Sequence, residues 1–89
     1  IEVHVFNHRS IAEIFRTIRT LGGMIGCEAK TATLCERLEG GLDEIRRSAA
    51  ALPRRPRVYF EEWDEPQISG IRWVSELVEL AGGDDVFPE

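Results

Sequence analysis

The stretch Cys27–Leu52, CEAKTATLCERLEGGLDEIRRSAAAL, decides how the rest of the sequence is interpreted. Its apolar residues recur every three or four positions, which is the spacing of one face of an α-helix. They are Ala32, Cys35, Leu38, Leu42, Ile45, Ala49 and Leu52. A helix of 26 residues would be roughly 39 Å long, which is more than a small domain needs. Gly40-Gly41 lie inside it and indicate a kink, a close helix contact or a break.

A strand and a shorter helix are predicted before the long helix. Apolar and polar residues alternate over Ile1–Phe6, as in a half-buried strand. Ser10–Glu13 has the pattern of a capping box, in which the serine side chain accepts a hydrogen bond from the amide three residues later and the glutamate reaches back. Apolar residues at helical spacing continue from there to Gly22-Gly23, where we expect the helix to end.

A second strand and a third helix are predicted after the long helix. Arg57–Glu62 is the strand, Asp64–Gly70 a loop, and Arg72–Ala81 a helix that stops at Gly82-Gly83. The order β-α-α-β-α indicates an α/β architecture. Two strands form a marginal sheet on their own. We therefore expect these 89 residues to be a middle slice of a larger α/β protein, and the excised chain to form a dimer.

Composition excludes several classes of function. A formal net charge of −5 argues against nucleic acid as the main partner, and the basic cluster Arg54–Arg57 is interpreted as a solvated loop. No apolar run is long enough to span a membrane, and no signal peptide is visible. Cys27 and Cys35, eight positions apart on the predicted helix, are too distant for a disulfide.

No catalytic or metal-binding pattern is present. The sequence has no nucleophile elbow, no glycine-rich phosphate loop and no His-Glu-x-x-His motif, so we predict a protein that is not an enzyme. A hydrolase that uses Glu62 with Asp64 or Glu65 as a carboxylate pair stays open as an alternative. The two histidines, His4 and His8, do not combine with the cysteines in a zinc-site spacing, so no metal site is predicted.

The end of the second predicted strand is the candidate binding site. In open α/β sheets, ligands bind beyond the carboxyl ends of the strands, and Glu62-Trp63-Asp64 lie at such an end. Trp63 offers a flat apolar face and the acids offer hydrogen-bond acceptors. Arg72 and Trp73 would form the neighbouring edge. The alternative is that either tryptophan fills the core beneath the loop.

Three pieces of the chain carry a resemblance to a known family. They are FNHRSIAEIF (Phe6–Phe15), PRVYFEEWDEPQIS (Pro56–Ser69) and WVSELVELAGG (Trp73–Gly83). With the segments between them, they resemble the middle of a substrate-binding protein of ABC importers. The group is the one whose two lobes are joined by a single long helix and which carries cobalamin, haem, siderophores or chelated metal. The likeness is greatest to the cobalamin-type members.

The resemblance implies how the chain is organised. Residues 1–26 would end the N-terminal lobe, 27–52 would form the interlobe helix, and 53–89 would begin the C-terminal lobe. The loop Trp63–Arg72 would line a cleft for cobalamin, haem or a ferric siderophore, with no resident cofactor. The protein would be periplasmic or extracytoplasmic, and its partner would be an ABC permease, which it would contact through residues outside this chain. A helical interaction module, pairing two chains through Ala32–Leu52, remains the alternative.

Overall fold

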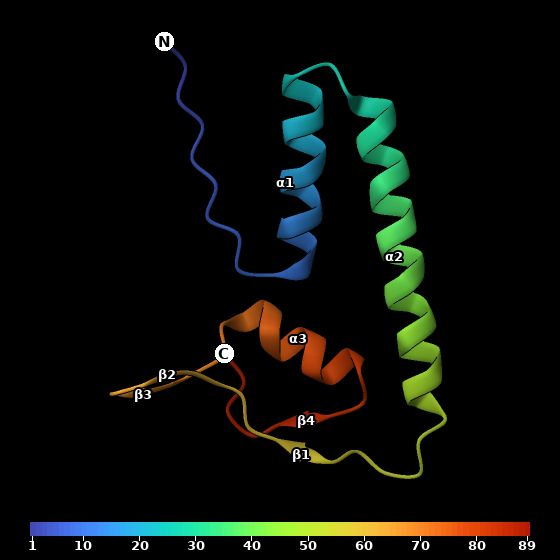
Figure 1. Ribbon diagram of the computed structural model, residues 1–89, viewed down its shortest axis with the longest axis vertical. Helices are drawn as coiled ribbons and strands as arrows, with labels where there is room; N and C mark the ends of the chain where they lie inside the picture. Colours follow the sequence, from blue (N-terminus) through green and yellow to red (C-terminus); the bar gives the residue numbers. More distant parts are fainter.

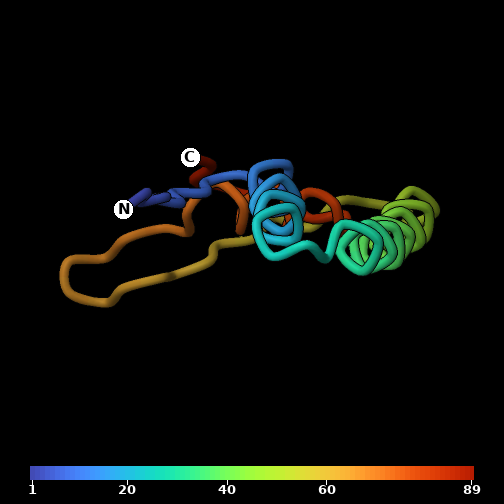
Figure 2. Tube along the Cα trace, turned by 90° about the horizontal axis from the view of Figure 1, so that it is seen from above, coloured from blue at the N-terminus to red at the C-terminus, as the bar shows by residue number.

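Three helices and two small sheets form a thin slab in the computed structural model, which describes residues 1–89 (Figure 1). The slab extends over 46 × 36 Å and is 14 Å thick. Seen from above, the first two helices lie side by side, and a hairpin projects from the opposite end (Figure 2). None of the helices combines the length and the apolar composition that a membrane span requires. The α/β class predicted from the sequence is confirmed.

Helix α1 (Ile11–Met24) begins at the predicted capping box. Ser10 Oγ accepts a hydrogen bond from the Glu13 amide at 3.1 Å, and the Glu13 carboxylate accepts one from the Arg9 amide at 2.7 Å. The predicted end at Gly22-Gly23 is wrong, because the helix continues to Met24 and the chain then turns at Gly26, whose φ is +72°.

Gly22 is needed inside α1 because a second helix, α2 (Glu28–Ala50), approaches it closely. A Cβ atom at Gly22 would lie 2.3 Å from Thr31 Oγ1. The glycine is therefore a contact point between antiparallel neighbours, not a helix terminator.

Helix α2 confirms the long helix predicted from the apolar stripe. It runs through Gly40-Gly41 without a break, and a Cβ atom at either position would meet no atom within 4 Å. The predictions of a break and of a close helix contact there are therefore wrong for this chain. Within the stripe, Cys35 is fully buried, whereas Leu38 and Ile45 are 41% and 49% exposed. The stripe is thus covered only in part.

A parallel β-α-β unit forms the last third of the chain. Strand β1 (Arg57–Val58) pairs with β4 (Asp84–Asp85) in parallel, with Arg57 opposite Asp84. Helix α3 (Arg72–Leu80) connects them and confirms the predicted third helix. Arg55 donates hydrogen bonds to the carbonyl oxygens of Glu79 and Gly83, at 3.0 and 2.7 Å. One arginine of the predicted solvated loop therefore caps the carboxyl end of α3.

Two strand predictions are wrong. The predicted strand Arg57–Glu62 is divided between β1 and β2 (Glu61–Asp64), and β2 pairs with β3 (Gln67–Ser69) in an antiparallel hairpin where a loop was expected. Ile1–Phe6 is extended but unpaired, and its apolar side chains are exposed. Period-2 alternation is present in that segment, but no other segment of this chain lies beside it to form a ladder.

Few side chains are buried, and glycines form many of the close contacts. Nine of the 89 residues are buried, and among them the apolar side chains are those of Cys35 and Val74. A Cβ atom at Gly82 would lie 3.0 Å from Leu52 and 3.1 Å from Ala49, which shows how closely the end of α3 meets the end of α2. The helices are therefore held by backbone proximity and polar contacts more than by an apolar core.

Replacing Gly22 by alanine tests the contact between α1 and α2. The new methyl group would collide with Thr31 and force the helices apart, so we expect Gly22→Ala to lower the free energy of unfolding by about 1–3 kcal/mol. Chemical denaturation followed by circular dichroism measures it. Gly23→Ala is the matched control, because no atom lies within 4 Å of that position. Equal stability of the two variants would contradict the assigned contact.

Candidate functional site

The β2–β3 hairpin presents an exposed apolar face. Trp63 pairs across the ladder with Ile68, so the two side chains lie on the same face of the hairpin. They are 59% and 49% exposed, respectively. Trp63 Nε1 donates a hydrogen bond to the Glu65 carbonyl oxygen at 2.8 Å, which orients the indole ring. Figure 2 shows this hairpin projecting away from the helices. Trp63 is therefore a surface residue of this chain and does not fill its core.

Glu62 joins the hairpin to the start of α3. Its carboxylate accepts a hydrogen bond from the Ile71 amide at 3.2 Å. Ile71 is the N-cap of α3 and has no side chain that can cap the helix, so Glu62 supplies the missing acceptor. Asp64 lies at the turn of the hairpin, opposite Gln67, and is exposed. Of the two acids, Glu62 stabilises the start of α3 through its hydrogen bond, whereas the exposed carboxylate of Asp64 is available to contact a ligand.

The structure does not bring the two tryptophan rings together. Trp73 is half-buried in the first turn of α3. The aromatic rings that do meet are those of Tyr59 and Phe87, edge to face, with centroids 5.9 Å apart. Partial desolvation and the neighbouring Glu61 raise the pKa of Tyr59 above its usual value. A continuous aromatic wall made by Trp63 and Trp73 is thus absent from this chain.

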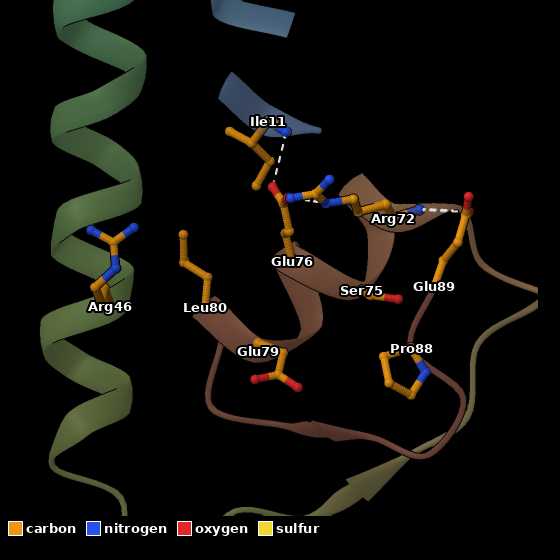
Figure 3. Close-up of a pocket in the computed structure, with 9 residues that line it drawn as sticks. All are labelled: Ile11, Arg46, Arg72, Ser75, Glu76, Glu79, Leu80, Pro88 and Glu89. Atoms are coloured by element: carbon orange, nitrogen blue, oxygen red, sulfur yellow. Dashed lines mark hydrogen bonds and ion pairs between the residues drawn. The ribbon is translucent and has the colours of Figure 1, made fainter. Parts of the chain in front are cut away.

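Arg72 belongs to a cluster of charged side chains around the starts of α1 and α3 (Figure 3). Arg72 Nε lies 3.3 Å from a Glu76 oxygen, and the other Glu76 oxygen accepts from the Ile11 amide at 2.9 Å. Glu89 accepts from the Arg72 amide at 3.0 Å and pairs with the Arg9 side chain. Two carboxylates, those of Glu76 and Glu89, thereby accept from the first amides of α1 and α3.

A cavity of about 600 Å³ lies beside this charged cluster. Ile11, Arg46, Arg72, Ser75 and Glu76 are among the residues that line it (Figure 3). Of the five predicted site residues, Arg72 alone lines it. Ser75 Oγ is buried there without a hydrogen-bond partner. Most of the residues that line the cavity are polar by type, and the arginines and glutamates among them are ion-paired.

Sequence reasoning missed Arg9, Glu76 and Glu89. Glu76 and Ile11 are 65 residues apart, and Arg9 and Glu89 are 80 apart. The one available indication was the need of every helix start for an acceptor, since α3 has no capping side chain of its own at Ile71. No group of three or more His, Cys, Asp or Glu side chains is arranged to hold a metal ion.

Comparison with known proteins gives the family. The chain matches the periplasmic binding protein family (Peripla_BP_2) over residues 1–89. It belongs to this family. Among solved structures, the crystal structure of S. aureus IsdE complexed with heme matches with a TM-score of 0.80 at 19% sequence identity. The match covers 100% of this chain and 36% of the IsdE chain, and at this identity it shows the shared fold. No curated protein matches.

The family assignment confirms the resemblance found in the sequence. The chain spans about a third of the length of IsdE, which agrees with the small number of buried residues.

Proposed function

We propose that this chain is part of the substrate-binding component of an ABC importer. In this proposal the protein is an extracytoplasmic receptor, without catalytic activity, that binds cobalamin or an iron chelate and delivers it to a membrane permease. The match to the periplasmic binding protein family over residues 1–89 carries the proposal. The likeness of the fold to IsdE, crystallised with heme, supports a flat iron-containing macrocycle as the ligand.

The proposed division into lobes follows how the elements pack on α2. Residues 1–26 would end one lobe and include α1, which meets the first turns of α2 at Thr31. Residues 53–89 would begin the other lobe and include α3, whose end meets α2 at Ala49. Residues 27–52 would be the connection between the lobes. Support comes from the different parts of α2 that the two sides contact, since α1 meets it from Thr31 to Glu39 and the end of α3 meets it at Ala49.

The hairpin and the start of α3 would form one wall of the ligand cleft. Trp63 and Ile68 offer a flat apolar face that suits the plane of a macrocycle, and Asp64 offers an acceptor at its rim. Glu62 holds this face next to α3 through the Ile71 amide. Arg72 and Trp73 lie at the first turn of α3 and would form the adjacent edge. In this arrangement the apolar face contributes affinity, and the polar groups orient the periphery of the ligand.

Replacing Trp63 by alanine tests this wall in the full-length protein. Loss of the stacking face should weaken binding of hemin or cobalamin by about 1–3 kcal/mol, the scale for burial of a large apolar side chain. The melting temperature should change little, because the side chain is 59% exposed. Ile45→Ala is the matched control, since Ile45 is an exposed apolar residue of α2, remote from the hairpin in sequence. Unchanged affinity combined with a large loss of stability would show that Trp63 serves the fold.

A second candidate function is self-association through α2. Leu38 and Ile45, seven positions apart on one face of the helix, are both exposed, and this is the spacing found in helices that pair. The hydrolase alternative has no such support, because Glu62 is committed to the Ile71 amide.

The isolated chain tests the second candidate. We expect residues 1–89 alone to form dimers at micromolar concentration in sedimentation experiments, because so much apolar surface is exposed. The variant Leu38→Glu/Ile45→Glu should be monomeric if α2 makes the interface. A well-folded monomer of the unaltered chain would contradict self-association.

A further inference from the structure

The β2–β3 hairpin is irregular, because β2 contains one residue more than the part of β3 opposite it. Glu61 lies opposite Ser69 in the ladder. Two positions later on β2, Trp63 lies opposite Ile68, which is only one position from Ser69. Glu62 is therefore the extra residue of a β-bulge. A bulge bends its strand and changes the direction of the side chains beside it, so the direction of Trp63 depends on how this bulge is held.

The Glu62 side chain holds the bulge against α3. Its carboxylate accepts a hydrogen bond from the Ile71 amide at 3.2 Å. The chain between the end of β3 and the N-cap of α3 is the single residue Gly70. The bond thus joins the bulge in β2 to the point at which the chain leaves the hairpin and begins α3.

The base of the hairpin is fixed by close packing. A Cβ atom at Gly70 would lie 2.8 Å from Val74 Cγ1 and 3.3 Å from Phe60 Cδ1. Phe60 immediately precedes β2, and Val74 is a buried residue of α3. Since this contact fixes the position of the base, what the Glu62 bond determines is the direction of the strands beyond it.

Beyond the bulge, polar contacts orient the Trp63 ring more than packing does. The side chain is 59% exposed, so few neighbouring atoms restrain it. Its Nε1 donates to the Glu65 carbonyl oxygen at 2.8 Å, which fixes the ring relative to the turn of the hairpin. Glu62 fixes the strand relative to α3. Together the two hydrogen bonds set the direction in which the flat apolar face points.

We propose that Glu62 is a positioning residue for ligand binding. Its bond to the Ile71 amide fixes the bulge and thereby aims the Trp63 ring, and its carboxylate does not contact the ligand. Because the ring is ordered before binding, the ligand does not have to order it, and the affinity is higher. The inference rests on the proposed function, in which Trp63 is the stacking face of the cleft. Asp64, one position further and exposed, is left as the acid that meets the periphery of the ligand.

Fluorine NMR of the ligand-free full-length protein, labelled with fluorotryptophan, measures how the ring is held. The Trp63 signal is assigned by its loss in Trp63→Phe. We expect Glu62→Ala to shift and broaden this signal, because the ring then samples several directions. Glu62→Gln keeps a side-chain oxygen that accepts from the Ile71 amide, so it should restore the unaltered signal. Since glutamine is uncharged, this rescue separates the hydrogen bond from a direct effect of the charge on the ring.

The matched control for the fluorine signal is Glu61→Ala. It removes the neighbouring carboxylate of β2 and leaves the bond between Glu62 and Ile71 in place, so the Trp63 signal should stay narrow. A Trp63 signal that is identical in Glu62→Ala and in the unaltered protein would overturn the proposal.

Binding of hemin and cobalamin to the same variants distinguishes aiming the ring from contacting the ligand. Glu62→Ala should weaken the affinity by about fivefold, the scale of one hydrogen bond, and Glu62→Gln should not. In a Trp63→Ala background, Glu62→Ala should cause no further loss, because Glu62 acts through the ring. Equal losses in the two backgrounds would overturn the proposal, since they would show that Glu62 contacts the ligand itself. If the unaltered protein binds neither ligand, the proposed function fails, and the fluorine signal still decides whether Glu62 aims the ring.

Discussion

The hydrogen bond from the Ile11 amide to the Glu76 carboxylate is the interaction on which the arrangement of this chain depends. It satisfies the start of α1 with an acid carried by α3, and the same acid holds Arg72 at 3.3 Å. Only two apolar side chains, those of Cys35 and Val74, are buried. The burial of apolar surface therefore contributes little free energy to the packing of the helices. Carboxylates at helix starts fill that role, since Glu62 and Glu89 accept from the first amides of α3 in the same way.

The features that could be predicted from sequence are those with local causes. The stripe of apolar residues predicts α2, and the Ser10 box predicts the start of α1, because each depends on residues three or four positions apart. The Ile1–Phe6 strand was predicted wrongly for the opposite reason, because a strand exists only when a partner lies beside it. The hairpin after Trp63 is local, since Trp63 pairs with Ile68 five positions later, and it was missed because Pro66 and Gly70 are residues typical of a loop.

The residues of the candidate site also fall into those that the sequence could indicate and those that it could not. Residue type and position led to the choice of Trp63, whose ring the structure leaves exposed on the hairpin, and its contact with a ligand stays a prediction. They were not enough to separate the roles of the acids, of which Glu62 supports α3 while Asp64 is free. Residue type and position also gave no indication of the pair between Arg9 and Glu89, which are 80 positions apart in the sequence. The proposed ligand face and the charged cluster are both anchored to the first turn of α3, so a ligand held by the hairpin would act on the element that also contacts α1.

Hydrogen–deuterium exchange of the full-length protein, with and without hemin, tests the central claim most directly. The claim is that this periplasmic binding protein segment meets its ligand through the β2–β3 hairpin. The account predicts that ligand slows amide exchange over Glu61–Ser69 and at the start of α3, with little change along the exposed face of α2. Unchanged exchange in the hairpin, while protection appears elsewhere in a protein shown to bind hemin, would contradict it.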